Sequence, residues 1–125
     1  MNRILIASLA LLVSTSFHIP SAAAEEEAGF TNIFDGKTLK NWDGNPAFWS
    51  VQDGAITGQT TKENPTKGNT VIIWRGGTLG DFELRLQFRI DGGNSGIQYR
   101  SKEVNKWVIG GYQADFDSAG GWTGT

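Results

Sequence analysis

The sequence predicts an all-β fold, an antiparallel β-sandwich of the jelly-roll type. Three observations support this prediction. Apolar residues recur mostly at every second position, which is typical of half-buried strands. Glycines, of which the chain has 17, gather with Asn, Asp and Pro in short turn-forming clusters between the apolar runs. Only residues 101–106 resemble a helical turn, so strands are expected to form most of the ordered structure.

The chain begins with a pattern that predicts a secretory signal peptide at residues 1–24. Arg3 gives a basic start, residues 4–13 are an almost continuous apolar run, and small residues precede a cleavage point after Ala24. The apolar run is shorter than the roughly 20 residues that cross a bilayer as a helix, so no membrane span is expected in the mature chain. We therefore expect a secreted or periplasmic protein.

The mature chain is expected to open with an acidic exposed tail, residues 25–29, followed by one domain over residues 30–125. A short first strand is expected at 30–34. Residues 48–52 and 55–58 flank an Asp-Gly pair, which favours a two-residue hairpin because both turn positions take positive φ.

Further along, residues 70–74 form a β-branched run that suits a strand. The clearest strand is expected at residues 82–90. Its apolar side chains all fall on one face and its polar side chains on the other, which predicts a half-buried strand. The apolar face consists of Phe82, Leu84, Leu86, Phe88 and Ile90.

Two last strands are expected at residues 95–101 and 107–116. The second is among the most apolar and is therefore expected to be central in its sheet. It is followed only by a glycine-rich loop that reaches Thr125 without a return strand. The sandwich is accordingly expected to be incomplete at its C-terminus.

Composition narrows the chemistry that this chain can perform. It has no cysteine, and its one histidine, His18, lies in the expected signal. This excludes disulfides, a cysteine nucleophile, a Ser-His-Asp triad and His- or Cys-ligated zinc from the mature chain. The 11 basic and 13 acidic residues form no basic stripe, so nucleic acid is not an expected partner. Carboxylates, hydroxyls, Lys, Arg, Tyr or a bound divalent cation remain.

Three polar side chains stand on one face of the strand at 107–116 and just beyond it: Gln113, Asp115 and Asp117. Carboxylates two residues apart on a strand are about 6.6 Å apart, close enough to couple their titrations or to share a cation. A plainer interpretation is that Asp117 opens the following turn and that Asp115 is simply solvated.

The neighbouring strand places Gln98 and Arg100 on one face. If the two strands pair in register, these residues stand beside Gln113 and Asp115. An amide, a guanidinium and carboxylates on one surface suit the hydroxyl groups of a sugar. The alternative is a cross-strand salt bridge between Arg100 and Asp115.

The five tryptophans support the same ligand class. Trp49 and Trp74 occupy strand positions and are expected in the core. Trp42, Trp107 and Trp122 lie near turns, where an indole ring could stack on the apolar face of a sugar. Carbohydrate is therefore the leading expected partner, while the oligomeric state is not indicated.

At these residues the sequence resembles the 3-keto-disaccharide hydrolase domain family. The resemblance implies a concanavalin A-like jelly roll, as in lectins and glucanases. It also implies activity on 3-keto-glycosides, either by hydrolysis or by elimination and hydration. Domains of this family are longer than this chain. The matching motifs are residues 29–39, Trp42, and residues 49–56, 81–84, 93–100 and 111–115.

The chemistry implied is proton removal beside a ketone. A ketone at C3 acidifies the C2 proton, a carboxylate removes it, the C1 substituent leaves, and water adds back. Our hypothesis makes Asp115 the base, with Arg100 or a divalent cation of unknown identity stabilising the enolate. Substrate contacts are assigned to Gln98, Gln113, Asp117 and Trp122, with Asp117 also a candidate metal ligand.

Two other functions remain open at this point. A non-catalytic sugar-binding jelly roll would use the same tryptophans and amides without a base. A glucanase would use Asp115 and Asp117 as an acid and nucleophile pair. Their expected spacing of about 6.6 Å lies at the edge of the inverting range and above the retaining one.

Overall fold

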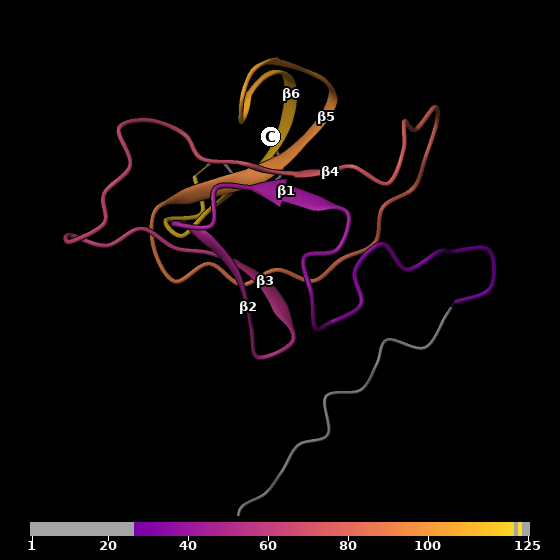
Figure 1. Ribbon diagram of the computed structural model, residues 1–125, viewed down its shortest axis with the longest axis horizontal. Coiled ribbons are helices and arrows are strands. Elements are labelled where there is room, and N and C mark those ends of the chain that lie inside the picture. The colour runs from indigo at the N-terminus through magenta and orange to yellow at the C-terminus, as the bar shows by residue number, and fades with distance from the viewer. Residues whose placement is uncertain (1–26, 122, 124–125) are drawn as a thin grey trace, which may run out of the picture.

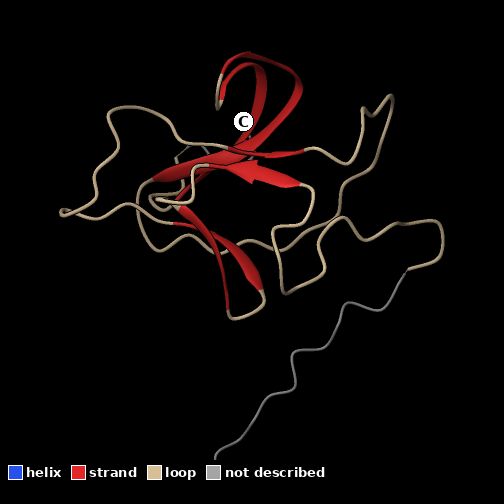
Figure 2. Ribbon diagram, viewed as in Figure 1, coloured by secondary structure: helices blue, strands red, loops and turns tan. Residues whose placement is uncertain are grey.

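The computed structural model describes residues 27–121 and 123, and its only regular elements are six β-strands. Figure 2 shows strands and loops throughout this part of the chain. The prediction of an all-β class is confirmed. The strands are β1 (Trp42–Gly44), β2 (Trp49–Gln52), β3 (Ala55–Gly58), β4 (Ile72–Trp74), β5 (Asn94–Asn105) and β6 (Val108–Asp117).

The expected signal peptide at residues 1–24 and the candidate ligand Trp122 lie outside the described residues. Within the described part, no helix is long and apolar enough to cross a membrane. Residues 27–29, the described end of the expected acidic tail, are exposed, and the Glu27 carboxylate forms an ion pair with Arg85.

The strands pair in three antiparallel two-stranded sheets, β1 with β4, β2 with β3 and β5 with β6. In Figure 1 the β5–β6 hairpin curls over one side of the β1–β4 pair, and the β2–β3 hairpin extends from the other side. The arrangement is jelly-roll-like, and the described strands do not close into a barrel.

Local turn chemistry builds the β2–β3 hairpin. Asp53 and Gly54 have φ angles of 49° and 78°, the left-handed values that a tight two-residue hairpin requires. The flanking residues pair in sequence, with Gln52 opposite Ala55 and Val51 opposite Ile56. The hairpin predicted from the Asp-Gly pair is confirmed.

The β5–β6 hairpin is the longest element, with strands of 12 and 10 residues. The helical turn expected at residues 101–106 is wrong, because β5 continues through this segment to Asn105. Pairing with β6 outweighs a weak local helical preference. The extension is irregular, since the register shifts between Tyr99 and Lys102 and again between Glu103 and Asn105.

Residues 82–90 do not form a strand, so the clearest strand expected from the sequence is wrong. Alternation decides which face of an extended segment is apolar, but a strand also needs a hydrogen-bonded neighbour. The described residues provide no such neighbour here. The expected burial of its apolar face is also wrong, since four of its residues are 41–50% exposed: Phe82, Leu84, Leu86 and Phe88. The Phe88 ring does stack on Phe116 of β6, with ring centroids 4.1 Å apart.

The short strand expected at residues 30–34 is also absent from the described structure. This segment leads into a turn at Asp35, whose carboxylate accepts hydrogen bonds from the backbone N–H groups of Lys37 and Thr38. These bonds to the Asp35 side chain satisfy backbone N–H groups that would otherwise pair with a neighbouring strand.

The packing is open, because no side chain among the described residues is fully buried. Trp49 and Trp74, expected in the core, are half-buried. The Trp49 indole donates to Thr70 Oγ1 at 3.0 Å, and the Trp42 indole donates to the Ile33 carbonyl at 2.8 Å. The Trp42 indole thus links β1 to the loop before it, and the Trp49 indole links β2 to the loop that precedes β4.

Candidate functional site

The candidate site lies on the polar face of the β5–β6 hairpin. Antiparallel pairing places Gln98 opposite Gln113 and Gly96 opposite Asp115. Residues opposite one another in an antiparallel pair point to the same face. The opposite face carries apolar pairs, among them Ile97 opposite Ala114. This pair lines an open pocket together with residues 84, 86 and 88, and Asp115 lies at the same pocket. The predicted division of the two strands into a polar and an apolar face is confirmed.

Three side chains on this face form one hydrogen-bonded chain, which we call the amide–carboxylate row: Gln98, Gln113 and Asp115. Gln98 Nε2 donates to Gln113 Oε1 at 2.7 Å, and Gln113 Nε2 in turn donates to Asp115 Oδ1. All three residues are half-buried. The predicted meeting of Gln98 and Gln113 is therefore confirmed, and Asp115 joins them along its own strand.

The row ends in different environments. At the Gln98 end, the Ser101 hydroxyl lies 3.3 Å from Gln98 Oε1 and 2.9 Å from the Tyr99 carbonyl. At the other end, Asp115 Oδ2 has no hydrogen-bond partner among the described residues. One carboxylate oxygen is thus held and the other is available to a ligand.

Arg100 does not meet Asp115, and this part of the predicted constellation is wrong. Arg100 lies where the register of β5 shifts, has a φ of 47°, and points its guanidinium to Asp81 at 3.3 Å. Its side chain is 72% exposed. Because the strands are antiparallel, Arg100 and Asp115 lie toward opposite ends of the row, about 13 Å apart along the strands. The alternative salt bridge between them is wrong for the same reason.

Asp117 opens the turn after β6, as the plainer interpretation predicted. Its Oδ1 accepts the backbone N–H of Ala119 at 3.3 Å, and its Oδ2 accepts that of Gly121 at 3.2 Å. Its own backbone N–H donates to Thr123 Oγ1 at 3.0 Å. The Asp117 carboxylate is therefore directed at the turn rather than at the row.

The polar face of the β5–β6 hairpin offers few carboxylate ligands for a divalent cation. Within residues 27–121 and 123, no three acidic side chains come together in a group that could hold a metal ion. Asp115 and Asp117 are separate carboxylates with different neighbours. The candidate cation therefore stays a prediction.

Sequence analysis missed a second polar cluster, which we call the Arg75 clamp: Arg75, Asp43, Glu103 and Trp107. Arg75 Nη2 contacts Asp43 Oδ2 and Glu103 Oε2, each at 2.7 Å. Trp107 donates its indole N–H to Asp43 Oδ1 and its backbone N–H to Glu103 Oε1, each at 2.9 Å. The clamp joins the β1–β4 pair to the tip of the β5–β6 hairpin.

Hydrogen bonds in the Arg75 clamp favour the charged carboxylates. The Trp107 indole and then Arg75 lower the pKa of Asp43, and the Trp107 backbone N–H and then Arg75 lower the pKa of Glu103. Trp107 was a candidate for stacking on a sugar, but its indole N–H is bonded here and Lys106 Nζ lies 4.3 Å from its ring centre. No local sequence pattern signals a cluster whose members are so distant in the chain.

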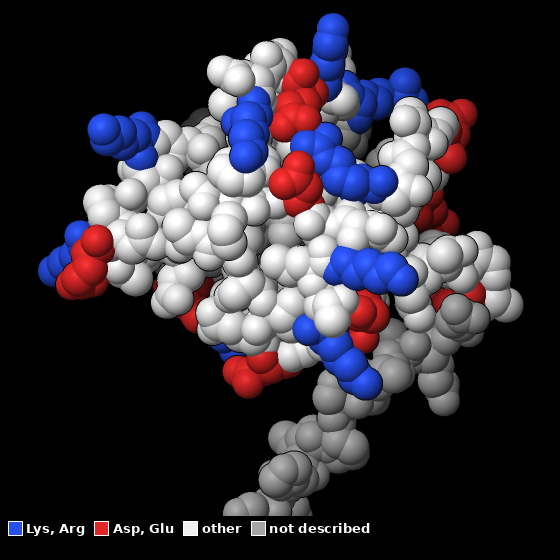
Figure 3. Space-filling model, viewed as in Figure 1, with Lys and Arg blue, Asp and Glu red and all other residues white. Residues whose placement is uncertain are grey.

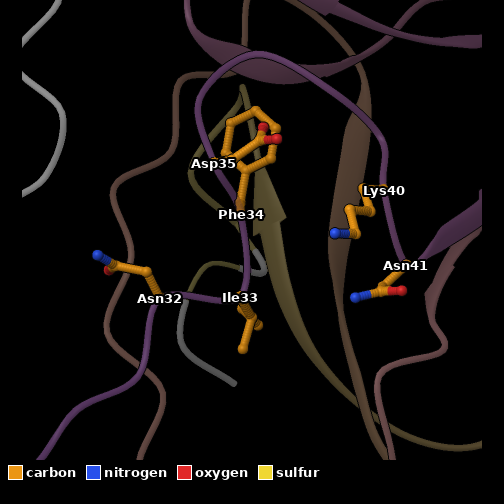
Figure 4. A pocket seen from close by; sticks show the side chains of 6 residues that line it. All are labelled: Asn32, Ile33, Phe34, Asp35, Lys40 and Asn41. Atoms are coloured by element: carbon orange, nitrogen blue, oxygen red, sulfur yellow. The ribbon is translucent and has the colours of Figure 1, made fainter.

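A small open pocket lies beside the first turn (Figure 4). The Asp35 carboxylate in its lining is committed to the turn, because the Thr38 hydroxyl and two backbone N–H groups donate to it. These bonds lower the pKa of Asp35 to about 2. The pocket is lined by Asn32, Ile33, Phe34, Asp35, Lys40 and Asn41.

Charged side chains of both signs are interspersed on the face of the molecule in Figure 3. Exposed ion pairs occur in the described part of the chain, for example Arg89 with Asp91 at 3.2 Å and Arg85 with Glu83 at 2.7 Å. Mixed charge of this kind does not create a strong field of one sign.

Comparison with known proteins found one curated relative and one family. A curated relative, the 3-keto-disaccharide hydrolase of Bacteroides thetaiotaomicron, is 36% identical over 88 residues, which cover 61% of this chain and 29% of that protein. The chain thus matches less than a third of that relative's length. No solved structure matches. The model of the 3-keto-alpha-glucoside-1,2-lyase-like domain matches residues 29–125, and the chain belongs to this family.

Proposed function

We propose that this chain is a carbohydrate-active domain that cleaves 3-keto-glycosides, including 3-keto-disaccharides, with net hydrolysis by elimination and hydration. Membership of the family and the name of the relative, a 3-keto-disaccharide hydrolase, support the substrate class. The observation that carries the proposal is Asp115, a half-buried carboxylate with one oxygen held by Gln113 and the other without a hydrogen bond from any residue that the structure describes.

The proposed reaction needs one strong base and one site for negative charge. Asp115 Oδ2 takes the C2 proton, and the C2–H electron pair moves toward the C3 ketone to give an enolate. The enolate electrons then form a C1–C2 double bond as the C1–O bond breaks, and the leaving oxygen takes up a proton. Water adds to C1 and a proton returns to C2, so the net result is hydrolysis.

The remaining roles are substrate binding and stabilisation of the enolate. Each amide of the row uses one N–H within it and keeps one for a substrate oxygen, which supports substrate binding by Gln98 and Gln113. The enolate oxygen is attached to C3, next to C2, so Arg100 stabilises it only if its side chain leaves Asp81 and turns toward Asp115. A divalent cation is the alternative for that role. Asp117 and Trp122 are also proposed to contact the substrate.

Export belongs to the same proposal. Residues 1–24 carry the basic start, apolar run and small-residue cleavage point of a secretory signal, which supports a secreted or periplasmic location. Expression in a bacterial host and N-terminal sequencing of the exported protein test this. The proposal expects a mature chain that begins at Glu25, and an uncleaved Met1 would contradict it.

A non-catalytic sugar-binding domain is the second candidate. The observation that favours it is the neutral character of most of the row, since amides bind hydroxyl groups without performing chemistry. The glucanase alternative is weaker, because both oxygens of Asp117 accept N–H groups of the turn and are not placed opposite Asp115 across a cleft.

Product analysis separates these functions. The protein is incubated with a 3-keto-glucoside, with 3-keto-sucrose, with the corresponding unoxidised sugars and with an unoxidised glucan. The proposal expects free 3-keto-glucose from the oxidised substrates only. Binding of sugar without any product would support the sugar-binding domain, and cleavage of unoxidised glucans would support the glucanase.

A further inference from the structure

We propose that Gln113 is a positioning residue that fixes the rotamer of Asp115, and that Gln98 fixes Gln113 from the opposite strand. This inference rests on the proposed function, because it explains how the assigned base is oriented. It goes beyond that function by giving the two amides a role toward Asp115 as well as toward the substrate.

The Gln113 amide has one favourable orientation. Gln98 Nε2 donates to Gln113 Oε1 at 2.7 Å, which requires the Gln113 oxygen to face β5. The Gln113 nitrogen must then face Asp115, to which it donates. If the Gln113 amide were rotated by 180°, its nitrogen would face Gln98 Nε2 and its oxygen would face the Asp115 carboxylate. Both hydrogen bonds would then be lost.

Gly96 leaves the space that the Gln113 side chain occupies, which is a steric feature independent of hydrogen bonding. Gly96 stands opposite Asp115 in the ladder. A Cβ atom at residue 96 would lie 2.7 Å from Gln113 Cγ and 2.7 Å from the Ala114 carbonyl oxygen. Gly96 is not among the glycines with positive φ, so its backbone does not require glycine. The space used by the Gln113 side chain does require it.

The hydrogen-bond donor to Asp115 is a neutral amide rather than a cation. A cationic partner stabilises a carboxylate and weakens it as a base, whereas a neutral amide orients it at smaller cost. Asp115 receives its hydrogen bond from an amide, and its second oxygen has no partner among the described residues. Gln113 thus restricts the rotation of the carboxylate and leaves one oxygen for the C2 proton.

NMR of the unliganded protein tests the positioning directly. The Hα–Hβ couplings of Asp115 are measured in wild type, in Gln113→Leu and in Gln98→Leu, with Gln87→Leu as an exposed control. The proposal expects unequal couplings in wild type and in the control, as for one χ1 rotamer, and averaged couplings in Gln113→Leu. Gln98→Leu removes the hydrogen bond that holds Gln113, so its Asp115 couplings should lie between those of wild type and Gln113→Leu. This variant replaces Gln113→Leu as the test if Gln113→Leu does not fold.

Kinetics with a 3-keto-glucoside add the functional readout. A misplaced base lowers kcat of Gln113→Leu by about 10- to 100-fold, in addition to the rise in KM that follows from the lost substrate hydrogen bond. A residue that only held a hydroxyl would raise KM alone. Unchanged Asp115 couplings, or an unchanged kcat with a raised KM, would overturn the positioning role. Averaged couplings in a protein whose wild type shows no turnover would support the positioning and overturn the proposed function.

Discussion

Asp43 and Asp115 are both half-buried strand carboxylates, yet their surroundings differ. Asp43 accepts hydrogen bonds from Arg75 on one oxygen and from the Trp107 indole on the other, and these bonds lower its pKa. Asp115 is held on one oxygen by a neutral amide. Residue type and strand position alone therefore do not identify a catalytic base. The surrounding donors do, because they decide whether an oxygen remains to receive a proton.

The largest effect is expected at Asp115. Asp115→Asn keeps the shape of the side chain and removes the base, so turnover of a 3-keto-glucoside should fall by about 10²- to 10⁴-fold. Thermal unfolding should change little, because Gln113 can still donate to the amide oxygen. Steady-state kinetics and a melting curve measure the two quantities, and wild-type turnover by this variant would remove Asp115 from the mechanism.

The opposite pattern is expected at Asp43. Asp43→Asn weakens the Arg75 clamp and should lower the Tm, while turnover per folded molecule stays close to that of wild type. Arg75→Met should lower the Tm further, since it leaves Asp43 and Glu103 without their shared cation. A loss of turnover at unchanged Tm would mean that the two carboxylates have the reverse roles.

Acid should weaken the clamp before it affects uncharged contacts. The pKa values of Asp43 and Glu103 are lower in the folded chain than their ordinary values. Their stabilising contribution is therefore complete above the ordinary values and is lost as the pH falls through the lowered ones. Urea unfolding between pH 7 and pH 3 measures this, and Asp43→Asn should show a shallower decline. Equal pH dependence in both proteins would contradict the assignment.

The smallest effect is local to the first turn. The pKa of Asp35 is about 2, below the ordinary 3.8, so its hydrogen bonds to Thr38 persist above pH 3.8 and are lost as the pH approaches 2. The Thr38 amide resonance should shift over this range. Asp35→Asn should remove the titration, and a Thr38 shift that persists in this variant would assign it to another group.

Patterns local in sequence predicted much of this structure. The Asp-Gly pair at 53–54 specified its hairpin through positive φ angles. Alternation placed Gln98 and Gln113 on one face, and the ladder brought them together. Alternation also oriented the apolar face of residues 82–90, but it could not provide a hydrogen-bonding neighbour, so no strand forms there.

Features set by distant or irregular pairing could not be predicted. The shift in register beside Arg100 moves that residue away from Asp115, and alternation contains no signal for such a shift. The Arg75 clamp joins residues separated by 32 positions for Asp43 and Arg75 and by 64 for Asp43 and Trp107. Only the pairing of β1 with β4 and the path of the long hairpin bring them together.

Solvent isotope incorporation tests the central claim, that Asp115 removes the C2 proton, most directly. The protein cleaves a 3-keto-glucoside in D₂O, and the early product is analysed by NMR against a sample of 3-keto-glucose kept in the same solvent without protein. The account predicts one deuterium at C2 beyond this background with wild type, and neither product nor deuterium above background with Asp115→Asn. Cleavage by wild type without deuterium at C2 would contradict the account.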